Sequence, residues 1–117
     1  MKNLNFLILP LLFIFSACGN GVSSQPINAA TVVTNGGVSQ HVVLTWDETS
    51  AVDGYNIYRS LISGGPYVEI GSASTKTFSD TAVQNGTTYY YVVTSFIENP
   101  LAESAYSVQM AVFVPTP

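Results

Sequence analysis

The order of apolar and polar residues from position 26 onward predicts a series of short β-strands. In HVVLTWDE at 41–48, Val42, Leu44 and Trp46 occupy every second position, which puts their side chains on one face of a strand. Turn residues such as SGGP and NG separate the segments, and no segment has the 3.6-residue period of a helix. We therefore expect seven strands packed as a two-sheet sandwich, within 27–33, 41–48, 55–60, 67–72, 76–81, 87–96 and 104–114.

Several motifs follow one another in a defined order over about residues 26 to 115, namely VVLTW, GYNIYRS, GGPYVEI, TFSDT and NGTTYYYVVT. In this order they resemble a fibronectin type III domain, particularly the versions in bacterial extracellular proteins. The resemblance implies an all-β fold, a seven-stranded immunoglobulin-like sandwich of two antiparallel sheets. The immunoglobulin pattern itself fits less well, because there is no cysteine pair and Trp46 falls on the second strand instead of the third.

The resemblance also assigns structural roles to the three consecutive tyrosines at 89–91. In that family a tyrosine near the start of the sixth strand packs under the preceding corner, and its hydroxyl bonds to backbone a few residues upstream. By position this is Tyr89, with Val83 as the apolar residue at the corner. Alternation then sends Tyr91 inward with Tyr89 and leaves Tyr90 on the other face. The structural side chains predicted in this way are Trp46, Tyr55, Val83, Tyr89 and Tyr91.

The other face of the same strands is a candidate binding surface. The family's sheet order makes the third and sixth strands neighbours, so their outward side chains share one face. Aromatic side chains on such a face stack on sugar rings or anchor a protein partner, but β-propensity alone also favours Tyr, Val and Phe on a sheet. Both interpretations remain open for Tyr58, Tyr90, Val92 and Phe96.

The final strand is a candidate for pairing with another strand. Residues 104–117 contain no charged side chain. The resemblance places this strand at a sheet edge, where backbone donors and acceptors stay free and charge is a usual protection. A partner strand could add there, at Val108, Met110 and Val112. The alternative is an edge that is short, twisted or covered.

The first 17 residues predict a signal peptide. Lys2 precedes an apolar stretch from Leu4 to Phe15, and small residues stand before Cys18. The apolar stretch is too short for a membrane span. FSAC resembles the lipobox of bacterial lipoproteins, although Phe15 stands where that family usually has leucine.

The lipobox resemblance implies three parts. They are a signal peptide at 1–17, a lipidated Cys18 with a flexible tether at 18–25, and the fibronectin type III-like domain at 26–117. The protein is then anchored in the cell envelope by its acyl chains. Gly19 is compatible with the outer membrane of a Gram-negative cell. An ordinary cleaved signal, and a secreted or periplasmic protein, is the alternative.

Composition excludes several functions. The formal net charge is −4, and Arg59 and Lys76 are the only basic side chains after Lys2, so there is no basic stripe for nucleic acid. The single histidine, His41, has no nucleophile and supporting acid in its neighbourhood, and the single cysteine makes no zinc site. The acids of one loop, Asp47, Glu48 and Asp53, lack the spacing of a calcium-binding loop. We expect no metal, no cofactor and no catalysis.

These observations predict a non-catalytic, membrane-anchored binding or scaffold lipoprotein that mediates protein–protein interaction at the bacterial cell envelope. The alternative is a carbohydrate-binding accessory module that uses the exposed aromatic rings of Tyr58, Tyr90 and Phe96. The expected partner is accordingly an envelope protein or a polysaccharide.

Overall fold

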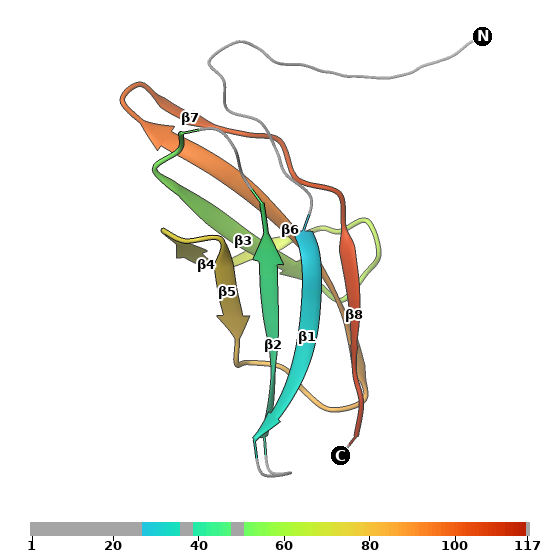
Figure 1. Cartoon of the computed structure of the whole chain (residues 1–117). Coiled ribbons are helices and arrows are strands. Elements are labelled where there is room, and N and C mark those ends of the chain that lie inside the picture. Colours follow the sequence, from blue (N-terminus) through green and yellow to red (C-terminus); the bar gives the residue numbers. More distant parts are fainter. Residues whose placement is uncertain (1–26, 36–38, 48–50, 117) are drawn as a thin grey trace, which may run out of the picture.

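The computed structural model describes residues 27–35, 39–47 and 51–116, which form a sandwich of two antiparallel sheets (Figure 1). The three-stranded sheet has the order β1 (Ile27–Asn35), β2 (Ser39–Trp46) and β5 (Thr77–Asp80). The five-stranded sheet has the order β4 (Val68–Ala73), β3 (Gly54–Ser60), β6 (Thr87–Glu98) and β7 (Leu101–Glu103), with β8 (Met110–Val114) also paired with β6. The predicted all-β sandwich is confirmed.

The final strand differs from the prediction. Within the predicted strand 104–114 only 110–114, which is β8, forms a strand, and a separate short strand, β7, precedes that range. The two strands pair with opposite ends of β6. Residues 104–109 between them are outside both strands. The expectations for the signal peptide, Cys18 and the tether lie outside the described residues. In the described part of the chain, no helix is long and apolar enough to cross a membrane.

The core lies between the two sheets and follows from strand alternation. Val42, Leu44 and Trp46 of β2 are buried, and the ring of Trp46 meets the ring of Tyr55 from β3 edge-to-face at 5.2 Å between centroids. Full burial of one such aliphatic side chain contributes about 1.5–3 kcal/mol. The rest of the buried apolar cluster consists of Ile27, Ile57, Tyr89, Tyr91, Val93, Val112 and Val114.

The corner before β6 is fixed by Tyr89. Its hydroxyl oxygen accepts a hydrogen bond from the backbone N–H of Gln84 at 2.8 Å, and Val83 packs half-buried against the core. The hydroxyl thus satisfies a backbone donor that no strand partner reaches. This is the arrangement that the resemblance to fibronectin type III domains implies for Tyr89 and Val83.

Replacing Tyr89 by phenylalanine should lower the free energy of unfolding by about 1 kcal/mol, because the partly buried N–H of Gln84 loses its acceptor. Urea denaturation monitored by tryptophan fluorescence measures the loss. Tyr90→Phe is the matched control, since no described residue makes a hydrogen bond to the Tyr90 hydroxyl, and it should be nearly neutral. Equal losses in both variants would contradict the role assigned to the Tyr89 hydroxyl.

A buried carboxylate links the two sheets. Asp80 of β5 is 4% exposed, and its Oδ2 accepts hydrogen bonds from Arg59 Nη1 of β3 at 2.8 Å and from the Tyr91 hydroxyl of β6 at 2.7 Å. Its Oδ1 accepts the N–H of Ala82. The guanidinium of Arg59 also lies 4.9 Å from the centre of the Tyr89 ring. Burial, together with the hydrogen bond to Asp80, raises the pKa of Tyr91 well above its usual range, so its hydroxyl stays a donor.

Candidate functional site

The segment 104–109, between β7 and β8, contains a bulge. Glu103 pairs with Phe96 and Met110 pairs with Tyr91, so seven residue steps of this segment lie opposite five steps of β6. Extra residues in one strand of an antiparallel pair disrupt the ladder locally and redirect side chains.

Two serines keep the bulged segment attached to β6. The N–H of Ser104 donates to the Ser95 carbonyl at 2.8 Å, and the Ser104 hydroxyl accepts from the Ser95 N–H at 3.0 Å. Ser107 makes the same pair of bonds with Val93, both at 2.9 Å. Each hydroxyl therefore replaces the carbonyl that a regular strand would supply.

The bulge brings Tyr106 to the outer face of the five-stranded sheet, the face turned away from the core. Regular alternation from Glu103 would send Tyr106 inward. Instead its ring meets the ring of Tyr58 at 5.0 Å and that of Tyr67 at 5.2 Å, both edge-to-face. The side chain remains 48% exposed. Three rings from distant parts of the sequence therefore gather at one place.

Gln109 fixes this cluster to the turn between β3 and β4. Its Oε1 accepts hydrogen bonds from the Tyr67 hydroxyl at 2.5 Å and from the N–H of Gly64 at 2.7 Å. Its Nε2 donates to the Ser63 hydroxyl at 3.1 Å. The position of Tyr67, and of the Tyr106 ring against it, is set by these bonds.

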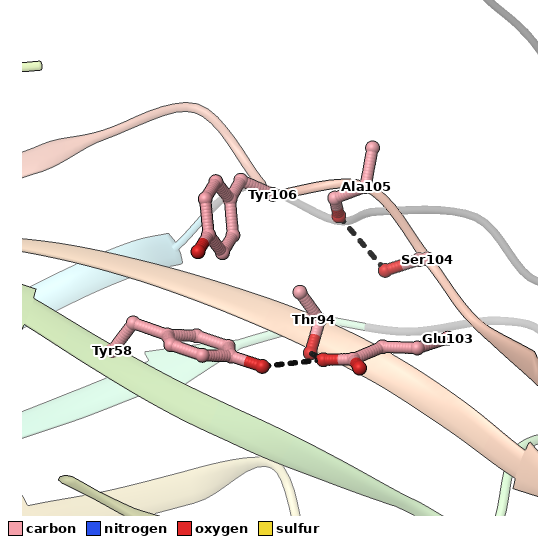
Figure 2. Close-up of a pocket in the computed structure, with 6 residues that line it drawn as sticks. All are labelled: Tyr58, Thr94, Glu103, Ser104, Ala105 and Tyr106. Atoms are coloured by element: carbon pink, nitrogen blue, oxygen red, sulfur yellow. Dashed lines mark hydrogen bonds between the residues drawn. The ribbon is translucent and has the colours of Figure 1, made fainter. Parts of the chain in front are cut away.

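A carboxylate lies beside the rings. Glu103 Oε2 accepts hydrogen bonds from the Tyr58 hydroxyl and from Thr94 Oγ1, both at 2.5 Å (Figure 2). It also accepts one from Asn56 Nδ2 at 3.1 Å. Partial burial opposes ionisation of Glu103, but the hydrogen bonds from Thr94, Tyr58 and Asn56 outweigh it and lower the pKa of this carboxyl group. Partial burial, followed by the hydrogen bond to Glu103, raises the pKa of Tyr58 to about 12. At neutral pH the pair is therefore a carboxylate and a neutral phenol.

These side chains line a shallow depression of about 390 Å³, at the lower end of the size range of ligand pockets. Figure 2 shows Tyr58, Thr94 and Glu103 on one side, with Tyr106, Ala105 and Ser104 on the other. We call it the tyrosine pocket, with the lining Tyr58, Thr94, Glu103, Ser104, Ala105 and Tyr106. It offers an aromatic surface, hydroxyl groups and one anionic acceptor.

The predicted binding face is only partly present. Tyr58 lines the tyrosine pocket, while Tyr90 and Phe96 are half-buried on the same face outside its lining. The prediction that Val92 faces solvent is wrong, because Val92 is 2% exposed. It lies opposite Tyr58 in the ladder between β3 and β6.

Sequence reasoning missed Tyr106, Tyr67 and Glu103. The signal that could have found Tyr106 is the SAYS sequence at 104–107, because serines that replace backbone acceptors mark a disrupted strand. Glu103 has no comparable signal, since its three donors come from β3 and β6.

The candidate edge residues have different environments. Val108 is exposed, Met110 is half-buried against the core, and Val112 is 6% exposed within it. The side chains of Met110 and Val112 are therefore core groups and not a contact surface. Within the described residues β8 pairs only with β6, and Phe113 is 58% exposed on its outer side. Strand addition at this edge stays a prediction.

The remaining ionisable groups do not converge. No three His, Cys, Asp or Glu side chains within 27–35, 39–47 and 51–116 come together as metal ligands. Asp47 Oδ2 accepts a hydrogen bond from Asn28 Nδ2 at 2.6 Å, and Asp53 Oδ2 accepts one from the Glu98 N–H at 2.7 Å. His41 is half-buried in β2, and Glu48 lies outside the described residues.

Comparison with known proteins identifies related sequences and, separately, solved structures with a similar fold. No family model matches the chain. The chain is 40% identical over 89 residues to the amylopullulanase of Thermoanaerobacter thermohydrosulfuricus, which covers 75% of the chain and 6% of that protein. It is 35% identical over 88 residues to the amylopullulanase of Thermoanaerobacterium saccharolyticum, which covers 74% of the chain and 7% of that protein. The chain therefore spans less than a tenth of the length of the curated relatives it matches.

Solved structures give the fold. A fibronectin type III-like protein from Clostridium thermocellum is 27% identical, with a TM-score of 0.66, over 84% of this chain and 98% of that one. A fibronectin type III domain of a human protein, 14% identical, has a TM-score of 0.67 over 82% of this chain and 76% of that one. The chain is thus a fibronectin type III-like domain whose sequence is related to a segment of amylopullulanases.

Proposed function

We propose that this protein is a non-catalytic accessory module that binds carbohydrate in the tyrosine pocket. The observation that carries the proposal is the combination of exposed Tyr106 with the carboxylate of Glu103 in one depression. The relatives support it, because amylopullulanases carry the matching segment and their name describes enzymes that act on polysaccharides. This proposal is the carbohydrate-binding alternative of the sequence analysis, with a different set of residues.

The chemistry of the pocket suits a sugar. The apolar C–H face of a pyranose packs on an aromatic ring, and its hydroxyl groups need hydrogen-bond acceptors at the ring edge. All three hydrogen bonds to Glu103 use Oε2, so among the described residues Oε1 has no donor. A sugar on Tyr106 would donate a hydroxyl to that oxygen. Tyr58, held by Glu103, forms the floor beneath it.

Replacing Tyr106 by alanine should weaken glycan binding at least about fivefold, because an aromatic anchor of a small site contributes more than about 1 kcal/mol. Isothermal titration with maltooligosaccharides and pullulan fragments measures the affinity. Phe113→Ala is the matched control, since Phe113 is an exposed ring outside the pocket. Circular dichroism checks that both variants stay folded. Unchanged affinity in Tyr106→Ala, or no binding by the unmodified protein, would overturn the proposal.

A second candidate function is docking of an envelope protein along β8. It is favoured by the exposed side chains of Val108 and Phe113 beside an uncharged edge strand. Backbone pairing at such an edge supplies affinity without a pocket. This candidate makes Phe113 important and Tyr106 dispensable, so the two variants above separate it from carbohydrate binding.

The location in the cell is also a proposal. Acylation of Cys18 would hold the domain beside the membrane, because a tether of residues 18–25 reaches at most about 28 Å when fully extended. A module held there would retain a polysaccharide close to the cell surface.

A further inference from the structure

We propose that the tyrosine pocket selects neutral oligosaccharides against acidic ones, and that Glu103 is the residue that determines this selectivity. The inference rests on the proposed function and adds the class of ligand. The ligands that the pocket should bind weakly are uronic acids and other glycans that carry carboxylate or sulfate groups.

The first step is the fixed charge in the pocket. The Glu103 carboxylate receives three hydrogen bonds, from Tyr58, Thr94 and Asn56, which hold it in place and stabilise its ionised form. Figure 2 shows two of these bonds, from Tyr58 and Thr94, and an incoming carboxylate at the same position would meet the like charge that they hold. The repulsion between the two carboxylates would be relieved only if one of them were protonated, and neither is protonated at neutral pH.

The second step is the lack of a compensating cation. The described part of the chain has two basic side chains of the Arg and Lys type, Arg59 and Lys76. Arg59 is paired with Asp80, and Lys76 precedes β5 in the other sheet. The other charge close to Tyr58 is Glu69, its ladder partner on β4, which is also negative. Acidic groups bound by proteins are usually met by Arg or Lys, and the described residues bring none to this pocket.

The third step is what the same carboxylate offers a neutral sugar. A carboxylate accepts hydrogen bonds and donates none, so it matches the hydroxyl donors of a hexose. Selectivity then comes from one group that attracts the neutral ligand and repels the acidic one. Like charges placed together at an interface cost enough to lower affinity by at least about tenfold.

The test compares two oligosaccharides with the same backbone, whose C6 groups are either neutral hydroxymethyl groups or carboxylates. Maltohexaose is the neutral probe, and the same oligosaccharide with its C6 hydroxyls oxidised to carboxylates is the acidic probe. Titration of the full chain in 150 mM NaCl limits the long-range effect of the net charge. The unmodified protein should bind the neutral probe at least about tenfold more tightly than the acidic one.

Two isosteric variants test whether Glu103 causes the preference for the neutral probe. Glu103→Gln keeps the size of the side chain and an oxygen acceptor for its three donors, and it should reduce the preference to about threefold or less. Asp47→Asn removes the same unit of charge from β2, in the other sheet, and should leave the preference unchanged. Circular dichroism confirms that both variants are folded.

Each result decides the question. Equal binding of both probes by the unmodified protein would overturn the selectivity while leaving carbohydrate binding intact. A preference that persists in Glu103→Gln, or that Asp47→Asn reduces equally, would overturn the role of Glu103. Binding of neither probe would overturn the proposed function and this inference together.

Discussion

Replacing Asp80 by alanine is expected to lower the free energy of unfolding by about 3 kcal/mol, a large part of the roughly 5–15 kcal/mol that stabilises a domain. The carboxylate is 4% exposed and joins β5 of one sheet to Arg59 and Tyr91 of the other. Its removal leaves the partly buried Arg59 guanidinium without a counter-charge and the buried Tyr91 hydroxyl without its acceptor. Removal of one partner destabilises the fold by more than the intact pair stabilises it, because the desolvation of the remaining groups is no longer offset.

Urea denaturation followed by the fluorescence of Trp46, the one tryptophan of the chain, measures this loss. Asp47→Ala is the matched control, because Asp47 is exposed and accepts one hydrogen bond from Asn28. It should change the free energy of unfolding by less than about 0.5 kcal/mol. Tyr91→Phe removes one hydrogen-bond donor to Asp80, and its loss in free energy of unfolding should lie between the losses of Asp80→Ala and Asp47→Ala. A loss below about 1 kcal/mol for Asp80→Ala would contradict the link between the sheets.

Lysine at Val112 is expected to unfold the domain, whereas lysine at the next residue, Phe113, is expected to be tolerated. Val112 is 6% exposed and belongs to the core cluster, while Phe113 is 58% exposed on the opposite face of β8. An unpaired ammonium in the core carries an effective penalty of several kcal/mol. At Phe113 the same ammonium reaches water, so the free energy of unfolding should change by about 1 kcal/mol or less.

Thermal unfolding monitored by circular dichroism distinguishes the two variants. The Phe113→Lys variant also tests strand addition, because lysine on an edge strand opposes pairing with another chain while the fold is kept. Loss of self-association or of a captured envelope protein in this folded variant would support docking at β8. A folded Val112→Lys variant would show that β8 does not direct Val112 into the core.

Much of the sandwich follows from local sequence. The alternation in β2 predicts the burial of Val42, Leu44 and Trp46, because period-2 patterning and strand geometry act on neighbouring residues. The corner at Tyr89 is predicted by the resemblance to fibronectin type III domains, and its bond to Gln84 spans only five residues. Both features involve residues that are close together in the sequence.

The tyrosine pocket depends on contacts between distant residues. Alternation places Tyr106 on the core face, and only the bulge, held by Ser104 and Ser107, reverses it. The Tyr58 hydroxyl donates to the carboxylate of Glu103, a residue 45 positions away in the sequence, so no local pattern connects them. Val92 is 2% exposed although alternation places it on the outer face, so its burial also depends on contacts outside its own strand.

Ser104 and Ser107 each make two hydrogen bonds to β6, and these bonds hold the strand register without the side chains that lie between the two serines. Each serine supplies both a donor and an acceptor to one residue of β6, so the ladder does not depend on the side chains of Ala105 and Tyr106 between them. Changes at these two positions alter what the pocket presents while the strand register is kept. Positions 105 and 106 are therefore suitable for grafting other side chains onto this sheet face without redesign of the fold.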